Sequence, residues 1–271
     1  MSELLRPRRQ PRQQRLDRIL ALLSTERAIS VTAIAAELGV STASIRRDLE
    51  VLEQQHLLER THGGAIAQGV SYELPLRYKS GRNEPQKRAI AAEAASRVTS
   101  ARSTVGLTGG TTTTEVARCL LDHPDLTVVT NALNIASELV VRTNVRLVVT
   151  GGVARTQSYE LVGPLAEASL SRVNVDVAFL GVDGVSVDAG FTTHQEMEAH
   201  TNSALLQRAT KVIAVADSSK LGKISFAQIC SLKRVDELIT DWAADPNLVA
   251  DLRNAGLAVT IVPRPAGVIS A

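Results

Sequence analysis

The chain has 271 residues, of which 44% are apolar, 21% charged and 3% aromatic, a composition typical of two globular domains with aliphatic cores. Its two cysteines, Cys119 and Cys230, are too few and too far apart for a disulfide scaffold or a four-cysteine zinc site, so we expect a reducing, cytoplasmic location. The sequence has no apolar run of about 18 residues, which excludes a membrane span, and its first residues do not form a signal region.

The net charge of +2 is unevenly distributed along the chain. Six arginines against Glu3 and Asp17 give residues 1–18 a local charge of +4. Such an arm suits a polyanion such as DNA, and it is equally typical of a solvated tail. The six arginines are Arg6, Arg8, Arg9, Arg12, Arg15 and Arg18.

Three helices are predicted in the first 60 or so residues. Apolar residues recur at helical spacing through Leu16, Ile19, Leu20 and Leu23, a β-prone segment follows at 28–31, and a second helix is expected over 32–38. Gly39 suits the left-handed residue that ends this helix, and Ser41 suits the N-cap of a third. A short helix, a glycine turn and a longer helix form a helix-turn-helix pattern.

The third helix is expected to bury Ile45, Leu49 and Leu52, which leaves small polar residues and an arginine pair on its other face. Small residues can approach base edges, and arginines can contact guanines or phosphates. The alternative is a plain helical hairpin with solvated arginines. The spacing of all these signals together favours DNA binding. Residues 57–65 are predicted to form a β wing.

The segments 40–49 and 60–65 closely resemble the DeoR family of sugar-metabolism regulators. The resemblance implies a winged helix-turn-helix domain over residues 1–65, with the third helix in the major groove and the wing on the DNA backbone. The family usually has glycine where this chain has His56, which is less favoured in a left-handed turn. The predicted DNA-contacting residues are Ser41, Thr42, Ser44, Arg46, Arg47, Arg60 and His62.

Residues 66–86 contain glycines and prolines without a period, and we predict a linker there. Over 87–271 predicted strands and helices alternate, which indicates a mostly parallel α/β domain with helices on both faces of its sheet. The predicted strands are 104–108, 126–130, 145–150, 175–180, 211–216, 236–240 and 257–262. The predicted helices are 87–99, 112–121, 132–141, 164–171, 196–209 and 246–255.

Small and polar residues follow five of these strands, and the carboxyl ends of parallel strands meet at the edge where ligands bind. Glycines and helix N-termini suit a phosphate, although ordinary turn chemistry would account for any one of these loops. Lys220 is either a phosphate anchor or a solvated lysine, and Glu198 either binds sugar hydroxyls or complements a helix dipole. The predicted effector-binding residues are Thr108, Gly109, Gly110, Thr111, Thr112, Thr113, Asn131, Gly151, Gly152, Gly181, Asp183, Glu198 and Lys220.

This second half resembles the DeoR-type sensor domain, which in turn resembles ribose-5-phosphate isomerase and coenzyme A transferases. The family commonly has aspartate at the position of Thr108, so a sugar contact made by that acid would be lost or replaced. Residues 181–196 are most similar to regulators of amino-sugar and galactosamine use. The segments that carry the resemblance are 110–112, 129–131, 151–152, 176–181, 198–199 and 217–220.

No cofactor or metal site is predicted. The chain lacks the dinucleotide fingerprint G-x-G-x-x-G. His194 and Glu196 form an H-x-E, but the P-C-x-x-C of zinc deaminases does not follow. His200 does not complete H-E-x-x-H either.

Together these features predict a repressor of a sugar-catabolism operon that a phosphorylated sugar releases from DNA, an amino-sugar or galactosamine-pathway intermediate being one candidate. The expected partners are operator DNA, the effector and further copies in a homodimer or homotetramer, since two-fold operators need paired readers. One alternative is a sugar-phosphate isomerase with an appended DNA module, in which Glu198 is the base and no second acid has a clear role. Another is a second domain that only mediates assembly.

Overall fold

The computed structural model describes residues 11–26, 28–55, 57–67, 73–99 and 102–265. The chain divides into two units, residues 1–74 and 75–271, which are treated separately below. Among the described residues, no helix is long and apolar enough to cross a membrane. The predictions for the basic arm over residues 1–10 and for the turn at His56 lie outside the described residues.

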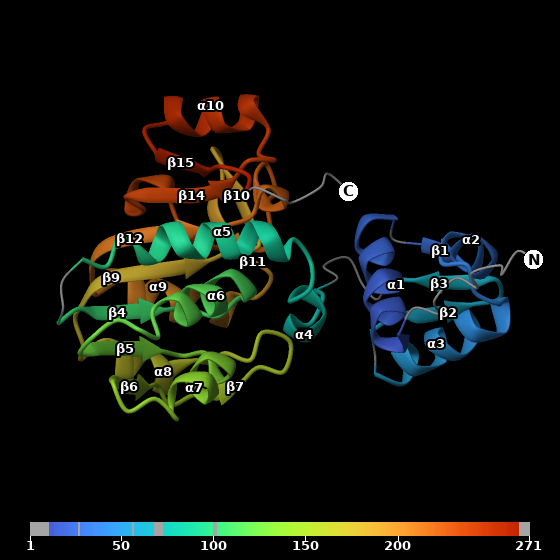
Figure 1. Cartoon of the computed structure of the whole chain (residues 1–271), viewed down its shortest axis with the longest axis horizontal. Helices are drawn as coiled ribbons and strands as arrows, with labels where there is room; N and C mark the ends of the chain where they lie inside the picture. Colours follow the sequence, from blue (N-terminus) through green and yellow to red (C-terminus); the bar gives the residue numbers. More distant parts are fainter. Residues whose placement is uncertain (1–10, 27, 56, 68–72, 100–101, 266–271) are drawn as a thin grey trace, which may run out of the picture. The chain divides into compact units, whose positions relative to one another are not determined.

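The described part of the first unit combines helices with a small antiparallel sheet (Figure 1). The sheet has the order β1-β3-β2, so β2 and β3 form the predicted wing with His62 and Gly63 at its tip. The apolar residues predicted to face the core, from Leu16 on the first helix to Leu52 on the third, are buried. The elements are α1 (Arg12–Glu26), β1 (Ala28–Ser30), α2 (Val31–Glu37), α3 (Thr42–Gln54), β2 (Glu59–Thr61) and β3 (Gly64–Ile66).

The turn between α2 and α3 has the predicted chemistry. Gly39 has a φ of +62°, a left-handed conformation that glycine adopts without steric cost. The Ser41 hydroxyl accepts a hydrogen bond from the Ser44 amide at 3.2 Å and thereby caps α3. The helix-turn-helix prediction is confirmed in both details.

A buried carboxylate that the sequence analysis does not identify joins α1 to α3. Asp48 is 1% exposed and accepts hydrogen bonds from Arg15 Nε at 2.9 Å and Arg12 Nε at 3.3 Å. Charge-assisted hydrogen bonds of this kind are stronger than neutral ones. The orientation of α3 on α1 therefore depends on an ion pair as well as on apolar packing.

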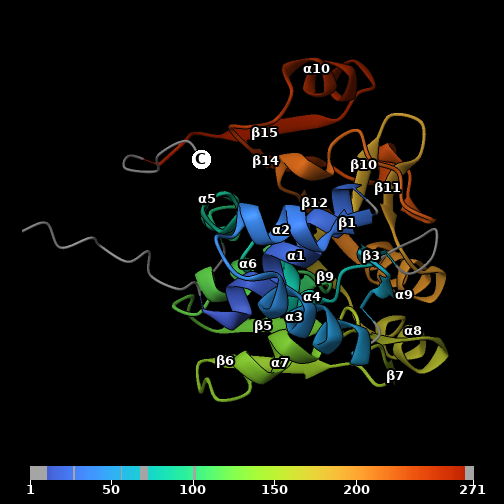
Figure 2. The same cartoon turned by 90° about the vertical axis from the view of Figure 1, so that its right-hand side faces the viewer.

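The second unit is built on a seven-stranded parallel sheet with the order β15-β14-β12-β9-β4-β5-β6, which confirms the predicted α/β class. Both views place β15 and β6 at opposite ends of this unit (Figures 1 and 2). The strands are β4 (Thr104–Leu107), β5 (Leu126–Thr130), β6 (Val145–Val149), β9 (Val175–Gly181), β12 (Ala209–Val215), β14 (Glu237–Asp241) and β15 (Ala258–Val262).

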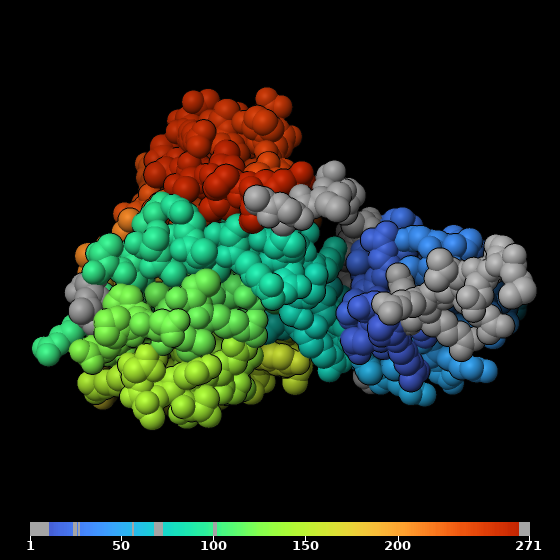
Figure 3. All heavy atoms as spheres, in the orientation of Figure 1, coloured from blue at the N-terminus to red at the C-terminus, as the bar shows by residue number. Residues whose placement is uncertain are grey.

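Helices cover both faces of the sheet and form a separate core on each. Successive residues of a strand face opposite sides, so Phe179 joins the core under α5, α6 and α7, whereas Ala178 and Leu180 join the core with α8, α9 and α10. Figure 3 shows the face that α5 and α6 cover. The helices are α5 (Glu84–Ala95), α6 (Thr111–Cys119), α7 (Leu133–Leu139), α8 (Pro164–Leu170), α9 (Glu196–Gln207) and α10 (Pro246–Asn254).

Short elements of the second unit are absent from the sequence prediction, because segments of two to four residues carry no periodic signal. One of them changes the predicted linker: Leu76 and Tyr78 are buried, and the Leu76 amide donates to the Gln157 carbonyl oxygen at 2.7 Å. The second unit therefore begins at residue 75 instead of 87, and the predicted linker over 66–86 is shorter than expected. These elements are α4 (Leu76–Lys79), the hairpin β7 (Val153–Ala154) with β8 (Leu161–Val162), and the antiparallel sheet β10 (Gly184–Ser186), β11 (Gly190–Thr193) and β13 (Ala227–Cys230).

We expect Asp48→Ala to lower the free energy of unfolding of the first unit by about 2–3 kcal/mol, because the substitution removes the buried carboxylate that pairs with Arg15, whose side chain is 14% exposed. Circular dichroism during urea unfolding measures the loss. The fluorescence of Trp242, the sole tryptophan and part of the second unit, should keep its transition.

The matched control is Glu50→Ala, which removes an exposed acid from the same helix and should change the stability by less than about 0.5 kcal/mol. Equal effects of the two substitutions would show that the buried ion pair does not stabilise this unit.

Candidate nucleic-acid interface and effector site

The predicted recognition helix has the surface that DNA binding requires. Thr42, Arg46 and Arg47 are exposed on α3, and Ser44 is half-buried at its first turn. Ser41 is exposed too, although its hydroxyl also caps the helix. Two guanidinium groups beside small side chains can reach base edges and phosphates together.

The wing places the two remaining predicted residues at the surface of the same unit. Arg60 on β2 and His62 at the tip are both exposed. Arg60 is joined to α3, since its amide donates to Glu53 Oε1 at 3.2 Å. The guanidinium lies 3.5 Å from Glu53 Oε2 in an exposed ion pair, which is weak enough for a DNA phosphate to replace. The wing thus adds a cation beside the recognition helix.

The second unit has a topological switch point between β4 and β9. The chain passes from β4 through β5 to β6 on one side, and then from β9 through β12 to β15 on the other. In such sheets ligands bind beyond the carboxyl ends of the two strands at the switch. Gly109 follows β4, and Gly181 ends β9. A Cβ on Gly181 would lie 2.5 Å from the Gly109 carbonyl oxygen, so only glycine fits there.

The loop after β4 leads into α6 with hydroxyls that close the start of the helix. Gly110 is the N-cap residue, with a φ of +128°. The Thr113 and Thr114 hydroxyls donate to the Gly110 carbonyl oxygen at 3.0 and 2.6 Å. Thr112 is buried and Thr111 half-buried. The predicted phosphate loop therefore has the expected backbone, but the hydroxyl of Thr113 is already in use.

Glu160 reaches this edge from the β7–β8 hairpin and is missing from the sequence prediction. It is fully buried, and its Oε1 accepts hydrogen bonds from the Gly109 amide at 2.6 Å and from Asn202 Nδ2 at 3.2 Å. Tyr159 just before it has a φ of +61°, a strained conformation that costs about 1–3 kcal/mol and is typical of functional sites. Burial raises the pKa of Glu160 and outweighs its hydrogen bonds with Glu198, Gly109 and Asn202.

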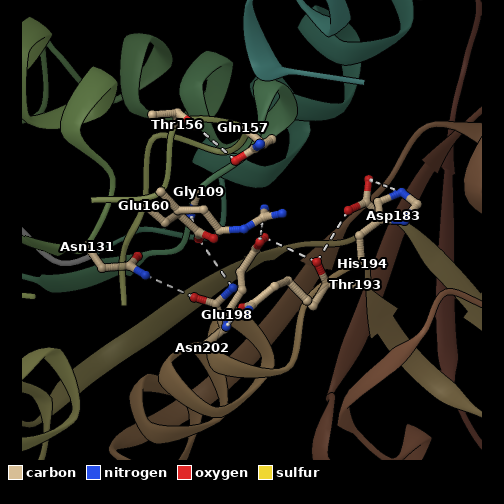
Figure 4. A network of polar contacts seen from close by, with 12 residues as sticks. Gly109, Asn131, Thr156, Gln157, Glu160, Asp183, Thr193, His194, Glu198 and Asn202 are labelled. Atoms are coloured by element: carbon tan, nitrogen blue, oxygen red, sulfur yellow. Dashed lines mark hydrogen bonds and ion pairs between the residues drawn. The ribbon is translucent and has the colours of Figure 1, made fainter. Parts of the chain in front are cut away.

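Polar contacts surround Glu160 and its neighbour Glu198 (Figure 4). On one side, Asn131 Nδ2 donates to Asn202 Oδ1 at 3.2 Å. On the other, Glu198 accepts a hydrogen bond from Thr193 Oγ1 at 3.1 Å. Glu198 also forms an ion pair with Arg155 at 2.8 Å. Residues predicted from separate strand ends are therefore brought into one network.

The network continues to Asp183, where positive charge accumulates. Thr193 Oγ1 contacts Asp183 Oδ2 at 3.3 Å, and both Lys79 Nζ and Lys220 Nζ lie 3.1 Å from Asp183 Oδ1. His194 Nε2 is 3.9 Å from the same oxygen. Burial acts to raise the pKa of Asp183, but the two lysines and His194 outweigh it and hold that pKa well below its usual value.

Further cations surround this carboxylate. Lys87 Nζ donates to the Lys79 carbonyl oxygen at 2.6 Å. Burial, together with nearby Lys220, Arg82 and Lys79 and against the opposing effect of Asp217, lowers the pKa of Lys87 to about 8. A group of cations that lower one another's pKa favours the binding of an anion. We refer to Lys79, Arg82, Lys87, Lys220 and Lys223 as the lysine cluster.

The predicted effector residues differ in how they relate to this site. Thr108 is buried, and its Oγ1 accepts a hydrogen bond from the Gly181 amide at 2.9 Å. Gly151 and Gly152 follow β6, two strands from β4, and Gly152 packs against the backbone of Val162. Gly152 thus allows β8 of the hairpin that carries Glu160 to pack closely, and neither glycine lies at the switch point. The groups missing from the sequence prediction are Lys79, Arg82, Lys87, Arg155, Glu160, Thr193, His194, Asn202 and Lys223.

No set of three or more His, Cys, Asp or Glu side chains suited to a metal ion occurs in the described part of the chain. The side chains of the site are cations, carboxyl groups and amides. Such groups bind oxyanions and hydroxyls.

Both halves of the chain match known domains. The DeoR-like helix-turn-helix domain matches residues 15–69, and the DeoR C terminal sensor domain matches residues 82–242. The chain is 39% identical to the HTH-type transcriptional regulator GlpR of Haloferax volcanii, with 91% of this chain and 96% of that protein covered. It is 35% identical to the putative aga operon transcriptional repressor of Escherichia coli O157:H7, with 92% and 93% covered.

Ribose 5-phosphate isomerase A from Methanocaldococcus jannaschii is similar to the chain at 18% identity and a TM-score of 0.39, with 51% of this chain and 54% of that chain covered. The fold is defined by the seven-stranded parallel sheet and by the match to the DeoR C terminal sensor domain.

A winged helix-turn-helix followed by a sensor domain of this kind defines a DNA-binding transcriptional regulator. The chain belongs to the DeoR family of such regulators.

The free energy of unfolding of the wild type should fall as the pH rises and Glu160 ionises, and Glu160→Gln should abolish this dependence on pH. A carboxyl group whose folded pKa lies above its unfolded value of 4.5 holds its proton longer in the folded state, so the free energy of unfolding falls as the pH rises between the two values. Glutamine has no proton to lose, so the stability of the variant relative to wild type should rise above about pH 4.5, by at most about 1.4 kcal/mol per pH unit.

Unfolding followed by Trp242 fluorescence at several pH values between 5 and 8 measures this difference. Glu196→Gln, which changes an exposed acid on α9, is the matched control. If the difference for Glu160→Gln varied with pH no more than that for Glu196→Gln, burial would not raise the pKa of Glu160.

Proposed function

We propose that this protein represses a sugar-catabolism operon and leaves its operator when a phosphorylated sugar binds at the carboxyl edge of the second unit's sheet. The observation that carries the proposal is the lysine cluster around Asp183, next to the switch point where α/β proteins bind ligands. An excess of cations over carboxylates is suited to a phosphate group.

The other end of the network suits the sugar. Asn131 Oδ1 is a buried acceptor that receives no hydrogen bond from the described residues. A hydroxyl or ammonium group of a ligand that reached it would supply the missing donor. We propose an amino-sugar or galactosamine-pathway phosphate as the effector, in keeping with the similarity to a putative aga operon repressor.

The proposed DNA contacts are those predicted from the sequence, from Ser41 at the start of α3 to His62 on the wing. Two-fold operators require two recognition helices, so we propose that the protein acts as a homodimer or homotetramer. We also propose that it works in the cytoplasm, where it has access to DNA.

We expect Arg47→Ala to weaken binding to a duplex that the wild type selects from random sequences by about 1–3 kcal/mol, since an exposed guanidinium on the recognition helix is lost. The slope of log affinity against log salt should fall by about 1. Fluorescence anisotropy over a series of salt concentrations measures both quantities.

Arg172→Ala is the control, because it removes the same charge from an exposed position in the second unit. If the two variants bind equally well, net charge explains the effect, and α3 is not the recognition helix.

Sugar phosphates should raise the unfolding midpoint of the second unit, whereas the same sugars without phosphate should not. A ligand at about 100 times its dissociation constant contributes about 2.7 kcal/mol. Trp242 fluorescence follows the unfolding of this unit. The panel contains galactosamine 6-phosphate, fructose 6-phosphate, fructose 1-phosphate, ribose 5-phosphate and the parent sugars. Lack of stabilisation by every phosphate would favour a domain that only mediates assembly.

The proximity of two carboxyl groups, Glu160 and Glu198, is the observation that favours the isomerase alternative, because an isomerase needs a positioned acid and base. Incubation of the protein with the same panel, followed by NMR, tests it. We expect every sugar phosphate to remain unchanged, and turnover of any of them would establish the enzyme instead.

A further inference from the structure

The first element of the second unit is part of the effector site. α4 (Leu76–Lys79) begins two residues after the point where the first unit ends. A helix of four residues is not stable alone, so its contacts with neighbouring segments fix its position. The position of α4, the first helix after the DNA-binding unit, therefore depends on those contacts.

Hydrogen bonds attach this segment to the groups of the site. The Leu76 amide donates to the Gln157 carbonyl oxygen at 2.7 Å, on the hairpin that carries Glu160. Lys79 Nζ donates to Asp183 Oδ1 at 3.1 Å. Just beyond α4, Asn83 Nδ2 donates to Asp217 Oδ1 at 2.9 Å. A ligand that changes these partners changes what holds α4.

Lys79 and Lys220 contact the same oxygen of Asp183 but differ in their place in the chain. Lys220 lies in a 3-10 turn (Ser218–Lys220) after β12, whereas Lys79 is the last residue of α4. A phosphate dianion attracts an ammonium group more strongly than a single carboxylate does, so it competes with Asp183 for both lysines. Withdrawal of Lys220 changes a loop of the site, and withdrawal of Lys79 shifts the end of α4.

We infer that Lys79 couples effector binding to DNA release: an anion bound in the lysine cluster draws Lys79 from Asp183 and displaces α4, while Lys220 only anchors the anion. The inference rests on the proposed function and specifies its regulation. A ligand shifts a conformational equilibrium only if it makes different contacts in the two states. Here the difference is that Lys79 contacts the bound phosphate in one state and the Asp183 carboxylate in the other.

Lys79→Gln and Lys220→Gln are a matched pair, because each removes one positive charge from the same oxygen. The readout is the ratio of operator dissociation constants with and without the panel sugar phosphate that gives the largest thermal shift, at a concentration that saturates each variant. Wild type should show a ratio of about 5–150. Lys220→Gln should need more sugar phosphate but keep the ratio, whereas Lys79→Gln should bring it close to 1. A wild-type ratio in Lys79→Gln, or an equal loss in both variants, would overturn the inference.

Hydrogen exchange gives a second test that does not require the true effector. Inorganic phosphate, compared with chloride at equal ionic strength, should speed exchange of the Leu76 and Tyr78 amides in wild type and not in Lys79→Gln. Unchanged exchange in wild type would also overturn the inference. Lys79→Arg, which keeps the charge, should behave as wild type. Lys79→Met, which removes the charge and keeps a long side chain, replaces Lys79→Gln if the latter does not fold. Failure of every sugar phosphate to bind refutes the proposed function instead.

Discussion

The close approach of two backbone segments at the carboxyl edge of the sheet is the constraint on which the proposed effector site depends. β4 and β9 are neighbours in the sheet. After them the chain continues to helices on opposite faces, α6 after β4 and α9 after β9, so the two loops meet at the strand ends and then separate. Gly109 and Gly181 allow the two loops to touch, and the Glu160 side chain occupies the space that a Cβ at Gly109 would need. Because the loops are locked together, side chains from the hairpin, from α9 and from α4 are held at fixed positions around one point.

The acids at this edge differ in what compensates their charge, and this difference gives the site two ends. Glu198 is paired with Arg155, and Asp183 is paired with lysines that hold its pKa low. Glu160 instead accepts from an amide and from Asn202, and burial raises its pKa. One end of the network therefore carries excess positive charge, and the other offers neutral donors and acceptors. A sugar phosphate is complementary to this arrangement, because its phosphate is negatively charged and its sugar carries neutral hydroxyl groups.

The periodic elements were predictable because each repeats its signal many times. The apolar stripe of α1 and the glycine turn before α3 are local patterns, and the structure contains both. The groups around Asp183 were not predictable, because Lys79 lies 104 residues away along the chain, on a four-residue helix without a period. Glu160 lies 51 residues from Gly109 along the chain and follows Tyr159, whose left-handed conformation no sequence motif predicts. The sequence pattern places the strand ends at one edge of the sheet. It does not predict that the β7–β8 hairpin and α4 also lie there and complete the site.

Thr108 shows why a difference from the family pattern is best interpreted from contacts. The resemblance to the family implies that a sugar contact is lost or replaced where aspartate is common. In the structure the Thr108 hydroxyl accepts from the Gly181 amide at 2.9 Å and donates to the Gly109 carbonyl oxygen at 3.3 Å, so it joins the two loops of the switch point. An aspartate here would add a negative charge beside Glu160, which burial already keeps from ionising readily. Threonine provides the same acceptor without that charge. The residue at 108 therefore sets the shape and charge of the switch point through its contacts with Gly109 and Gly181.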